Sequence, residues 1–212
     1  ASFGTGNMTQ ANAVSSVLLD QVNIPTWITG VVLVILTGAV IMGGIKSMGK
    51  FISYFSPVMV LLYILVSFFI IFTNFDKVPD AFGLIFSHAF SPFAAVGGFA
   101  GAAVAAAIRM GVSRGLFSNE AGLGSSAIAA AAAQTSDPVK QALVSMLQTL
   151  IDTLIVCTMT ATVILMAPVW LEGGSPALLT LKSFEYFLGE TGIIVVFITT
   201  VFFAYSTLLG WS

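Results

Sequence analysis

The sequence contains unusually few charged residues. Asp, Glu, Lys and Arg make up only 8% of its 212 residues, whereas a soluble domain carries about 25%. So few charges cannot cover a surface that faces water, and the outer surface must therefore face lipid. This scarcity excludes a soluble domain. The seven Lys and Arg residues are also scattered along the chain, which argues against a nucleic-acid interface.

Residues with reactive side chains are equally scarce. The single cysteine, Cys157, permits no internal disulfide, and it lies in an apolar run where cysteine usually acts as a small hydrophobic residue. The single histidine, His88, stands near the outer end of an apolar segment and is typical of an interfacial residue. We find no metal-ligand cluster, catalytic triad or phosphate loop, and Glu120 has no second carboxylate nearby. These absences argue against an enzyme.

Long uncharged segments are what the sequence does contain. A membrane-spanning helix needs about 20 consecutive apolar residues, and the mean hydropathy of the chain is +1.04. The segments predict spans at about 25–45, 51–74, 88–108, 142–167 and 191–212. Residues 1–19 resemble the end of an earlier span. Continuous apolar blocks such as Val58–Phe72 exclude the alternating pattern of a β-barrel. The predicted fold is an all-α polytopic membrane helix bundle.

The basic residues predict the orientation of these spans, because cytoplasmic loops are rich in Lys and Arg. Alternate loops contain Lys46 and Lys50, then Arg109, Arg114 and Lys140, which are five of the seven basic residues. The other side contains only Lys77 and Lys182, together with most of the acids. We therefore expect the first group in the cytoplasm. On the outer side, Leu178–Leu188 is expected to form a short amphipathic helix on the membrane surface.

One segment, Ala94–Ala107, is rich in glycine and alanine (AAVGGFAGAAVAAA). Small residues let helices pack closely, and Gly97 and Gly101 form a GxxxG pair. Alternatively, the adjacent Gly97 and Gly98 break the helix and expose backbone groups, which transporters use to bind substrate. The residues alone leave both interpretations open.

Polar residues inside two spans are candidate ion ligands. Asp152 is the only acid at the centre of a span, where a charge is costly and indicates either a functional site or a structural partner of a neighbouring polar side chain. Ser206 and Thr207 offer adjacent hydroxyl oxygens, which suit a hard cation such as sodium. Each hydroxyl can instead donate to a carbonyl of its own helix.

Four motifs connect these features to a known family. The longest is Gly111–Ser126 (GVSRGLFSNEAGLGSS), and the others are Gly4–Asn12 (GTGNMTQAN), Asp152–Thr158 (DTLIVCT) and Tyr205–Trp211 (YSTLLGW). In this order along the chain they resemble the sodium:alanine symporter family, also called alanine or glycine:cation symporters. The resemblance covers the whole chain.

The resemblance implies the architecture of the amino-acid, polyamine and organocation transporters. These have two inverted repeats of five helices, and each repeat opens with a broken helix. Residues 1–74 would be the end of repeat one and residues 75–212 the first part of repeat two, within one transmembrane domain. The chain also starts inside a motif and stops inside an apolar stretch. We therefore expect a fragment, truncated at both ends.

The family's functional residues map onto several positions. The span 88–108 corresponds to the broken helix that opens repeat two. We place the break at Gly97–Gly98, because Arg109 then lies at the cytoplasmic end, and Gly122–Gly124 is the competing position. The resemblance implies substrate contacts from Gly97, Gly98, Phe99, Gly101, Gln10, Thr207 and Trp211. It implies sodium ligands at Ser206 and Thr207, and Asp152 is a further candidate for the ion.

The function that the resemblance implies is secondary active transport. Sodium influx would drive uptake of a small neutral amino acid, alanine or glycine, across a bacterial or archaeal inner membrane. No cofactor is expected beyond the coupling ion. The alternatives are a membrane channel, for which no ring of like charges is visible, and a proton-coupled transporter of amino acids.

Overall fold

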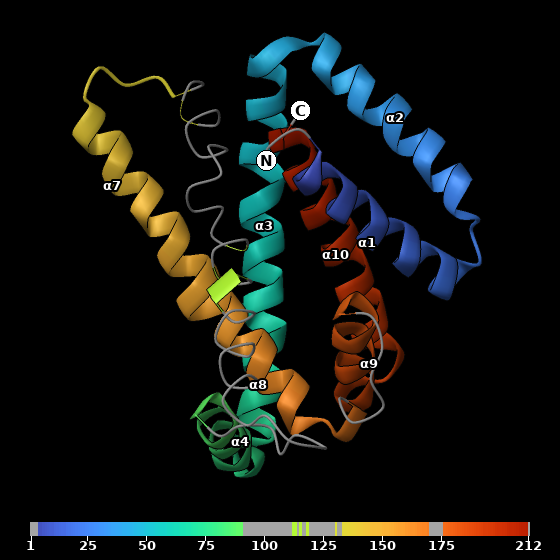
Figure 1. Cartoon of the computed structure of the whole chain (residues 1–212), viewed down its shortest axis with the longest axis vertical. Helices are drawn as coiled ribbons and strands as arrows, with labels where there is room; N and C mark the ends of the chain where they lie inside the picture. Colours follow the sequence, from blue (N-terminus) through green and yellow to red (C-terminus); the bar gives the residue numbers. More distant parts are fainter. Residues whose placement is uncertain are drawn as a thin grey trace, which may run out of the picture.

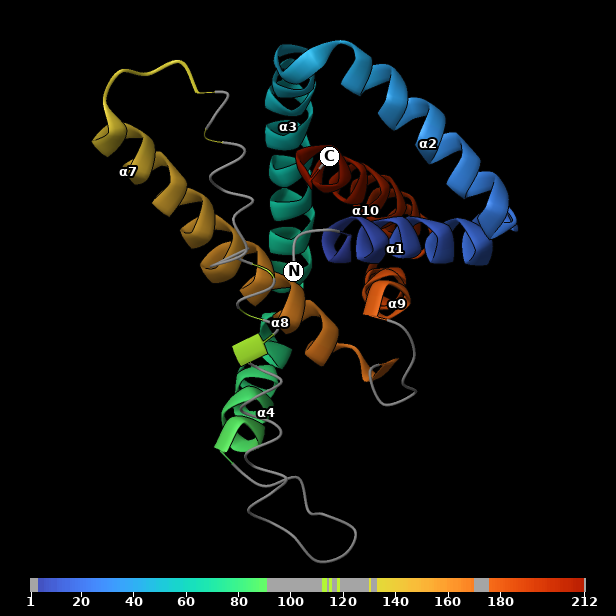
Figure 2. The ribbon, with the colours of Figure 1, turned by 45° about the horizontal axis from the view of Figure 1, so that its top comes forward.

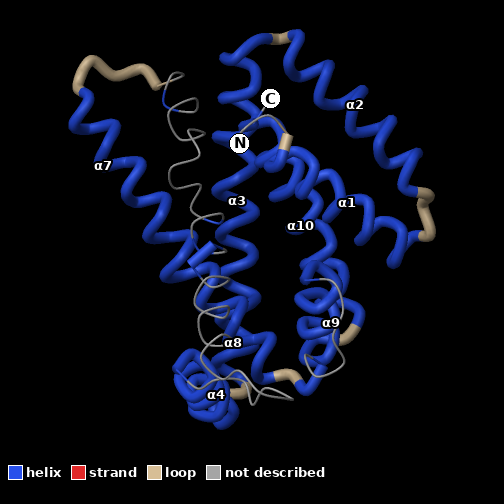
Figure 3. Tube along the Cα trace, in the orientation of Figure 1, coloured by secondary structure: helices blue, strands red, loops and turns tan. Residues whose placement is uncertain are grey.

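The chain folds into helices. The computed structural model describes residues 4–90, 112–113, 115, 118, 130, 133–169 and 176–211. In these ranges helices joined by short connections are the regular structure, and they contain no strand (Figures 1 and 3). The elements are α1 (Thr5–Val22), α2 (Thr26–Met42), α3 (Gly44–Thr73), the 3₁₀ turn η1 (Phe75–Lys77), α4 (Val78–Phe90), α7 (Pro138–Thr149), the π-helical segment η2 (Leu150–Cys157), α8 (Thr158–Met166), α9 (Pro176–Leu188) and α10 (Glu190–Trp211).

Several of these helices match the predicted spans. Three are long and apolar enough to cross a bilayer: Ile52–Thr73, Pro138–Met166 and Glu190–Gly210. The apolar helix α2, with 17 residues, is shorter. The predicted membrane helix bundle is therefore confirmed. Of the predicted span 88–108, only the first three residues lie in the described part of the chain, at the end of α4.

The helix α3 begins earlier than the span that the charges predict. It starts at Gly44, so Lys46 and Lys50 lie on its first turns and not in a loop. Helical hydrogen bonds are local, and the helix continues from Gly44 to Thr73 although Pro57 inside it lacks a backbone N–H donor. A charge pattern indicates where an apolar run ends, which need not be the residue where the helix ends. Gly44 itself has φ +74, a conformation that suits glycine at the turn from α2.

Local sequence signals explain where α1 ends and α7 begins. Asn23 adopts the left-handed conformation with φ 55, and the amide of Ile24 donates to the Leu18 carbonyl at 3.3 Å. This closes α1 as a helix C-terminal cap does. At the start of α7, the side chain of Asp137 accepts a hydrogen bond from the Val139 amide at 2.9 Å, with Pro138 as the first helical residue.

Helices α1 and α10 contact each other extensively, and α1 lies between α10 and α2 (Figures 1 and 2). Two clusters of buried residues hold them. The first combines α1, α3, α8, α9 and α10 through Val17, Tyr63, Ile70, Val163, Leu181, Phe184 and Val196. The second combines α1, α2 and α10 through Val14, Leu33, Ala204, Tyr205 and Leu209. The two clusters share α1 and α10, so this pair connects α2 to the rest of the bundle.

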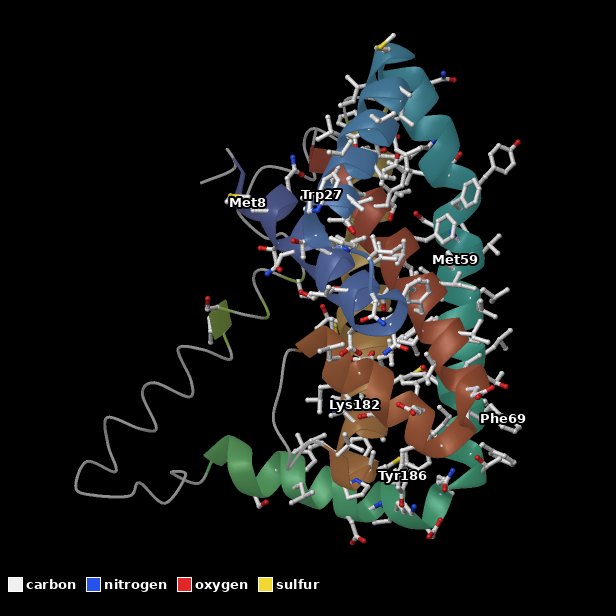
Figure 4. The ribbon with its side chains drawn as sticks, turned by 90° about the vertical axis from the view of Figure 1, so that its right-hand side faces the viewer. Met8, Trp27, Met59, Phe69, Lys182 and Tyr186 are labelled. Atoms are coloured by element: carbon white, nitrogen blue, oxygen red, sulfur yellow. The ribbon has the colours of Figure 1, made fainter. Side chains whose placement is uncertain are left out.

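Large apolar side chains also cover the outside of the bundle. Phe72 is 71% exposed and Val34 is 73% exposed, and Phe69 projects outward from α3 in Figure 4. In water such a surface would be unfavourable, since burial of apolar area is the main driving force of folding. Against lipid it has no such penalty. The exposed apolar surface thus agrees with the membrane location that the composition predicts.

The two ends of the bundle differ in the segments they contain. The start of α3 and the start of α7 lie at one end, and η1 and α4 lie at the other (Figure 1). At the second end the Lys77 ammonium lies 5.4 Å and 5.1 Å from the ring centres of Tyr186 and Phe187 on α9. A helix is confirmed at Leu178–Leu188 as part of α9 (Pro176–Leu188), and its place on the membrane surface stays a prediction. Its buried residues Leu181 and Phe184 pack onto the bundle.

Candidate functional site

A cavity of about 840 Å³ lies between α3, η2 and α10. This volume is in the range of small-molecule sites. Its wall consists of Ser56, Pro57, Val60, Leu61, Ile64, Ser118, Gln148, Ile151, Asp152, Ile155, Val156, Phe203 and Thr207. On each helix these residues recur at spacings of three and four, so each helix presents one face to the cavity. Most of the wall is apolar, with a few polar groups, as is typical of a ligand site.

Asp152 contributes the only carboxylate among the described residues of the cavity wall. It is half-buried, and its Oδ2 accepts a hydrogen bond from the Ser118 hydroxyl at 2.7 Å. The Ser118 oxygen also lies 3.5 Å from the Cys157 sulfur. Ser118 is 34 residues before Asp152 in the chain, so this contact connects two separate segments at the cavity. No Lys, Arg or His belongs to the described part of the wall.

The segment that carries Asp152 is not an ordinary α-helix. Leu150–Cys157 is π-helical and joins α7 to α8. The Thr158 hydroxyl lies 3.4 Å from the Thr153 carbonyl, five residues back, in keeping with this wider turn. The π-helical turns found inside α-helices occur often at functional sites. In Figure 1, α7 leans away from α3 on one side of this segment, whereas α8 packs close to α3 on the other.

The two adjacent hydroxyls of α10 have different surroundings. Thr207 lines the same cavity as Asp152 on η2. Ser206 donates a hydrogen bond to the Phe203 carbonyl of its own helix at 2.9 Å. Neighbouring side chains on a helix project about 100° apart, which explains why only Thr207 belongs to the wall.

Comparison of the sequence with known protein families identifies the family of this chain. The sodium:alanine symporter family matches residues 1–212, which is the whole chain. The chain belongs to this family of transporters. The expected resemblance is thereby confirmed, and the matched family is one of symporters.

The chain is similar to curated proteins from several organisms. The sodium/alanine symporter AgcS of Methanococcus maripaludis is 49% identical over all of this chain and 47% of its own length. An uncharacterized transporter of Haemophilus influenzae is 45% identical with the same coverage. The probable sodium/glutamine symporter GlnT of Bacillus subtilis is 38% identical over 99% of this chain and 43% of its own length. The chain thus spans about half the length of the relatives it matches.

The remaining predicted site residues lie outside the described cavity wall or outside the described residues. Gln10 lies on α1, which packs against α10, and is not part of the described cavity wall. Trp211 is the last residue of α10. Both predicted positions of the helix break, at Gly97–Gly98 and at Gly122–Gly124, lie outside the described residues, as do Phe99 and Gly101. Their roles remain predictions.

Three polar residues of the cavity wall were not predicted from the sequence. These are Ser56, Ser118 and Gln148. Gln148 lies four residues before Asp152, and this spacing would have placed it on the same helix face. Ser118 had no such signal, because it lies 34 residues before Asp152 in the sequence. The π-helical turns around Asp152 were also missed.

Proposed function

We propose that this chain is part of a secondary transporter that couples sodium influx to uptake of a small neutral amino acid, alanine or glycine, by alternating access. The observation that supports the proposal most strongly is the cavity, whose apolar wall carries Asp152 and Thr207 on two different helices. An apolar wall with a few polar groups is typical of a small-molecule site, in which the polar groups fix the orientation of the ligand.

The relatives also support this choice of ion and substrate. The name of the Methanococcus maripaludis protein describes sodium/alanine symport. Family membership further supports the inverted-repeat arrangement, with residues 1–74 as the end of repeat one and residues 75–212 as the first part of repeat two. In this proposal Gly97, Gly98, Phe99, Gly101, Gln10, Thr207 and Trp211 contact the amino acid, and Ser206 and Thr207 bind sodium.

The coupling of sodium influx to amino-acid uptake places a thermodynamic requirement on the binding site. Moving one charge through the membrane potential supplies about 2.3 kcal/mol per 100 mV, and the sodium gradient adds to this. That free energy drives uptake only if sodium and the amino acid strengthen each other's binding, and this coupling is reciprocal. Both ligands must therefore bind the same conformation, within reach of helices that move together.

The test is uptake of labelled alanine into liposomes that contain the full-length protein. A sodium gradient should drive saturable accumulation, and replacement of external sodium by choline should abolish it. Uptake that is independent of sodium, or that does not saturate, would contradict the proposal and favour a channel. Competition by unlabelled glycine, alanine and glutamine would define the substrate, since the name of one relative describes sodium/glutamine symport.

A proton-coupled transporter is the second candidate. A relative of Bacillus sp. strain PS3 is named sodium/proton-dependent alanine carrier protein and is 41% identical over 74% of this chain. The same liposomes distinguish the two ions. Uptake driven by a proton gradient at zero sodium would favour the second candidate.

A further inference from the structure

We infer that the Asp152 carboxylate and the Ser118 hydroxyl together form a binding site for a sodium ion at the wall of the cavity. The inference rests on the proposed function and extends it, because it adds ligands on η2 and at residue 118 to the hydroxyls of α10 that the proposed function names. It also gives a role to Ser118, which the sequence did not single out.

The first argument is charge. Asp152 projects a carboxylate into a largely apolar cavity, and no basic side chain belongs to the described part of the wall. A charge in such surroundings is costly unless an opposite charge compensates it. A single carboxylate matches the single charge of sodium. Sites for calcium usually collect several carboxylates, and the described residues contain no group of three or more acids, histidines or cysteines close enough to hold a metal ion.

The second argument is the chemistry of the pair. Sodium prefers hard oxygen ligands, as other hard cations do. A hydroxyl can act either as a hydrogen-bond donor or as a lone-pair ligand. In the structure Ser118 donates to Asp152 at 2.7 Å. If its hydrogen turns away, the same oxygen can face an ion that also contacts the carboxylate. The side-chain oxygens of Gln148 and Thr207, in the same wall, would extend the shell.

The third argument is the placement of the two ligands on different segments. Ser118 belongs to the long family motif, and Asp152 belongs to the π-helical segment between α7 and α8. An ion held between them would bring those segments together. An ion that bridges two segments stabilises the conformation in which they are close, which is the differential binding that coupling requires.

The experiment measures sodium binding and sodium-driven uptake separately, both in the full-length protein. Binding of ²²Na⁺ to the purified protein is measured without amino acid, and uptake is measured against external sodium. A hydroxyl that contacts a charged group contributes enough binding free energy that its removal should lower the affinity for sodium about tenfold. Ser118→Ala is therefore expected to raise the half-saturating sodium concentration about tenfold. Ser118→Thr should restore it, and Asp152→Asn should abolish saturable binding of this ion.

The matched control is Ser145→Ala, which removes a hydroxyl from α7, next to η2, at a position that is not part of the described cavity wall. It should leave sodium affinity unchanged. If Asp152→Asn does not fold, the pair Ser118→Ala and Ser118→Thr still decides the question. Wild-type sodium affinity in Ser118→Ala, or in a folded Asp152→Asn, would overturn the inference. A change in the dependence on pH, with sodium affinity intact, would overturn it as well.

The two measurements also separate this inference from the proposed function. If the wild type binds sodium through Asp152 but accumulates no small neutral amino acid, the proposed function fails and the ion site stands. If uptake depends on sodium and both variants keep the wild-type half-saturating concentration, the ion site fails and the proposed function stands.

Discussion

The hydroxyl of Tyr63 on α3 lies 2.6 Å from the hydroxyl of Thr160 on α8. Thr160 donates its own hydrogen to the Val156 carbonyl at 2.7 Å, so Tyr63 is the donor in the bond between the two helices. The Tyr63 ring also contacts Phe184 and Phe203 at centroid distances of 5.5 Å and 6.2 Å. Because Phe203 belongs to the cavity wall, this interaction fixes the helices that form the cavity.

The first prediction concerns this hydrogen bond. Tyr63→Phe should lower the free energy of unfolding by about 1 kcal/mol, and Thr160→Val by about 1–3 kcal/mol, because the second change leaves a buried donor without its partner. Thermal unfolding of the full-length protein in detergent measures both. Thr162→Val is the control, since the Thr162 hydroxyl bonds the Thr158 carbonyl of its own helix. Additive effects in the double variant would contradict a direct bond.

The second prediction concerns Gly192, where α10 passes α9. A Cβ at this position would collide with the backbone carbonyl of Phe184, and backbone cannot move aside cheaply. Gly192→Ala should therefore destabilise the protein by about 1–3 kcal/mol. Gly38→Ala on α2 is the control, because no atom lies within 4 Å of its added Cβ. Size-exclusion profiles and melting temperatures of the two variants should differ clearly, and equal behaviour would refute the packing described for α9 and α10.

The third prediction concerns orientation. Lys46, Lys50, Arg114 and Lys140 should be cytoplasmic, and Asp76 and Glu172 should be outside, because positive charges are retained on the inner side. Single cysteines at these sites, in a Cys157→Ala background, can be labelled in intact cells with an impermeant reagent. We expect labelling only at positions 76 and 172. Labelling of position 46 or 140 from outside would reverse the assignment.

The fourth prediction concerns the hydroxyls of α10. Thr207→Val keeps the shape of the side chain and removes the oxygen that faces the cavity, so it should raise the half-saturating sodium concentration for uptake. Ser206→Ala should have the smaller effect, since its hydroxyl bonds the Phe203 carbonyl. Trp211→Ala should loosen selectivity for small substrates. If neither hydroxyl variant alters the sodium dependence, sodium does not bind at α10.

The fifth prediction concerns the helix break. If Gly98 lies at exposed backbone that holds the amino acid, Gly98→Leu should fill the space and abolish uptake while the protein still inserts into the membrane. Gly122→Leu tests the competing position in the same assay. Loss of uptake in the second variant alone would move the break to Gly122–Gly124.

The sequence by itself determined that this protein is a helical membrane bundle and where most of its helices lie. Hydrophobicity over about 20 residues is a local property, and lipid requires every backbone group of a span to bond within its own helix. For this reason α2, α10 and the continuous helix from α7 through η2 to α8 lie close to predicted spans, and α3 contains another. Cap residues such as Asn23 and Asp137 act equally locally. Lys46 and Lys50 are exceptions, because charges indicate where an apolar run ends, whereas α3 already begins at Gly44.

Only the tertiary structure decided which polar residues meet. When apolar residues surround every face of a helix, their pattern does not show which face turns inward, because lipid and protein interior are alike to them. Asp152 was visible as an isolated charge, but its partner Ser118 lies 34 residues away in sequence. Likewise, adjacent Ser206 and Thr207 look equivalent in the sequence. The packing of α10 against its neighbours turns one hydroxyl to the cavity and leaves the other on its own helix.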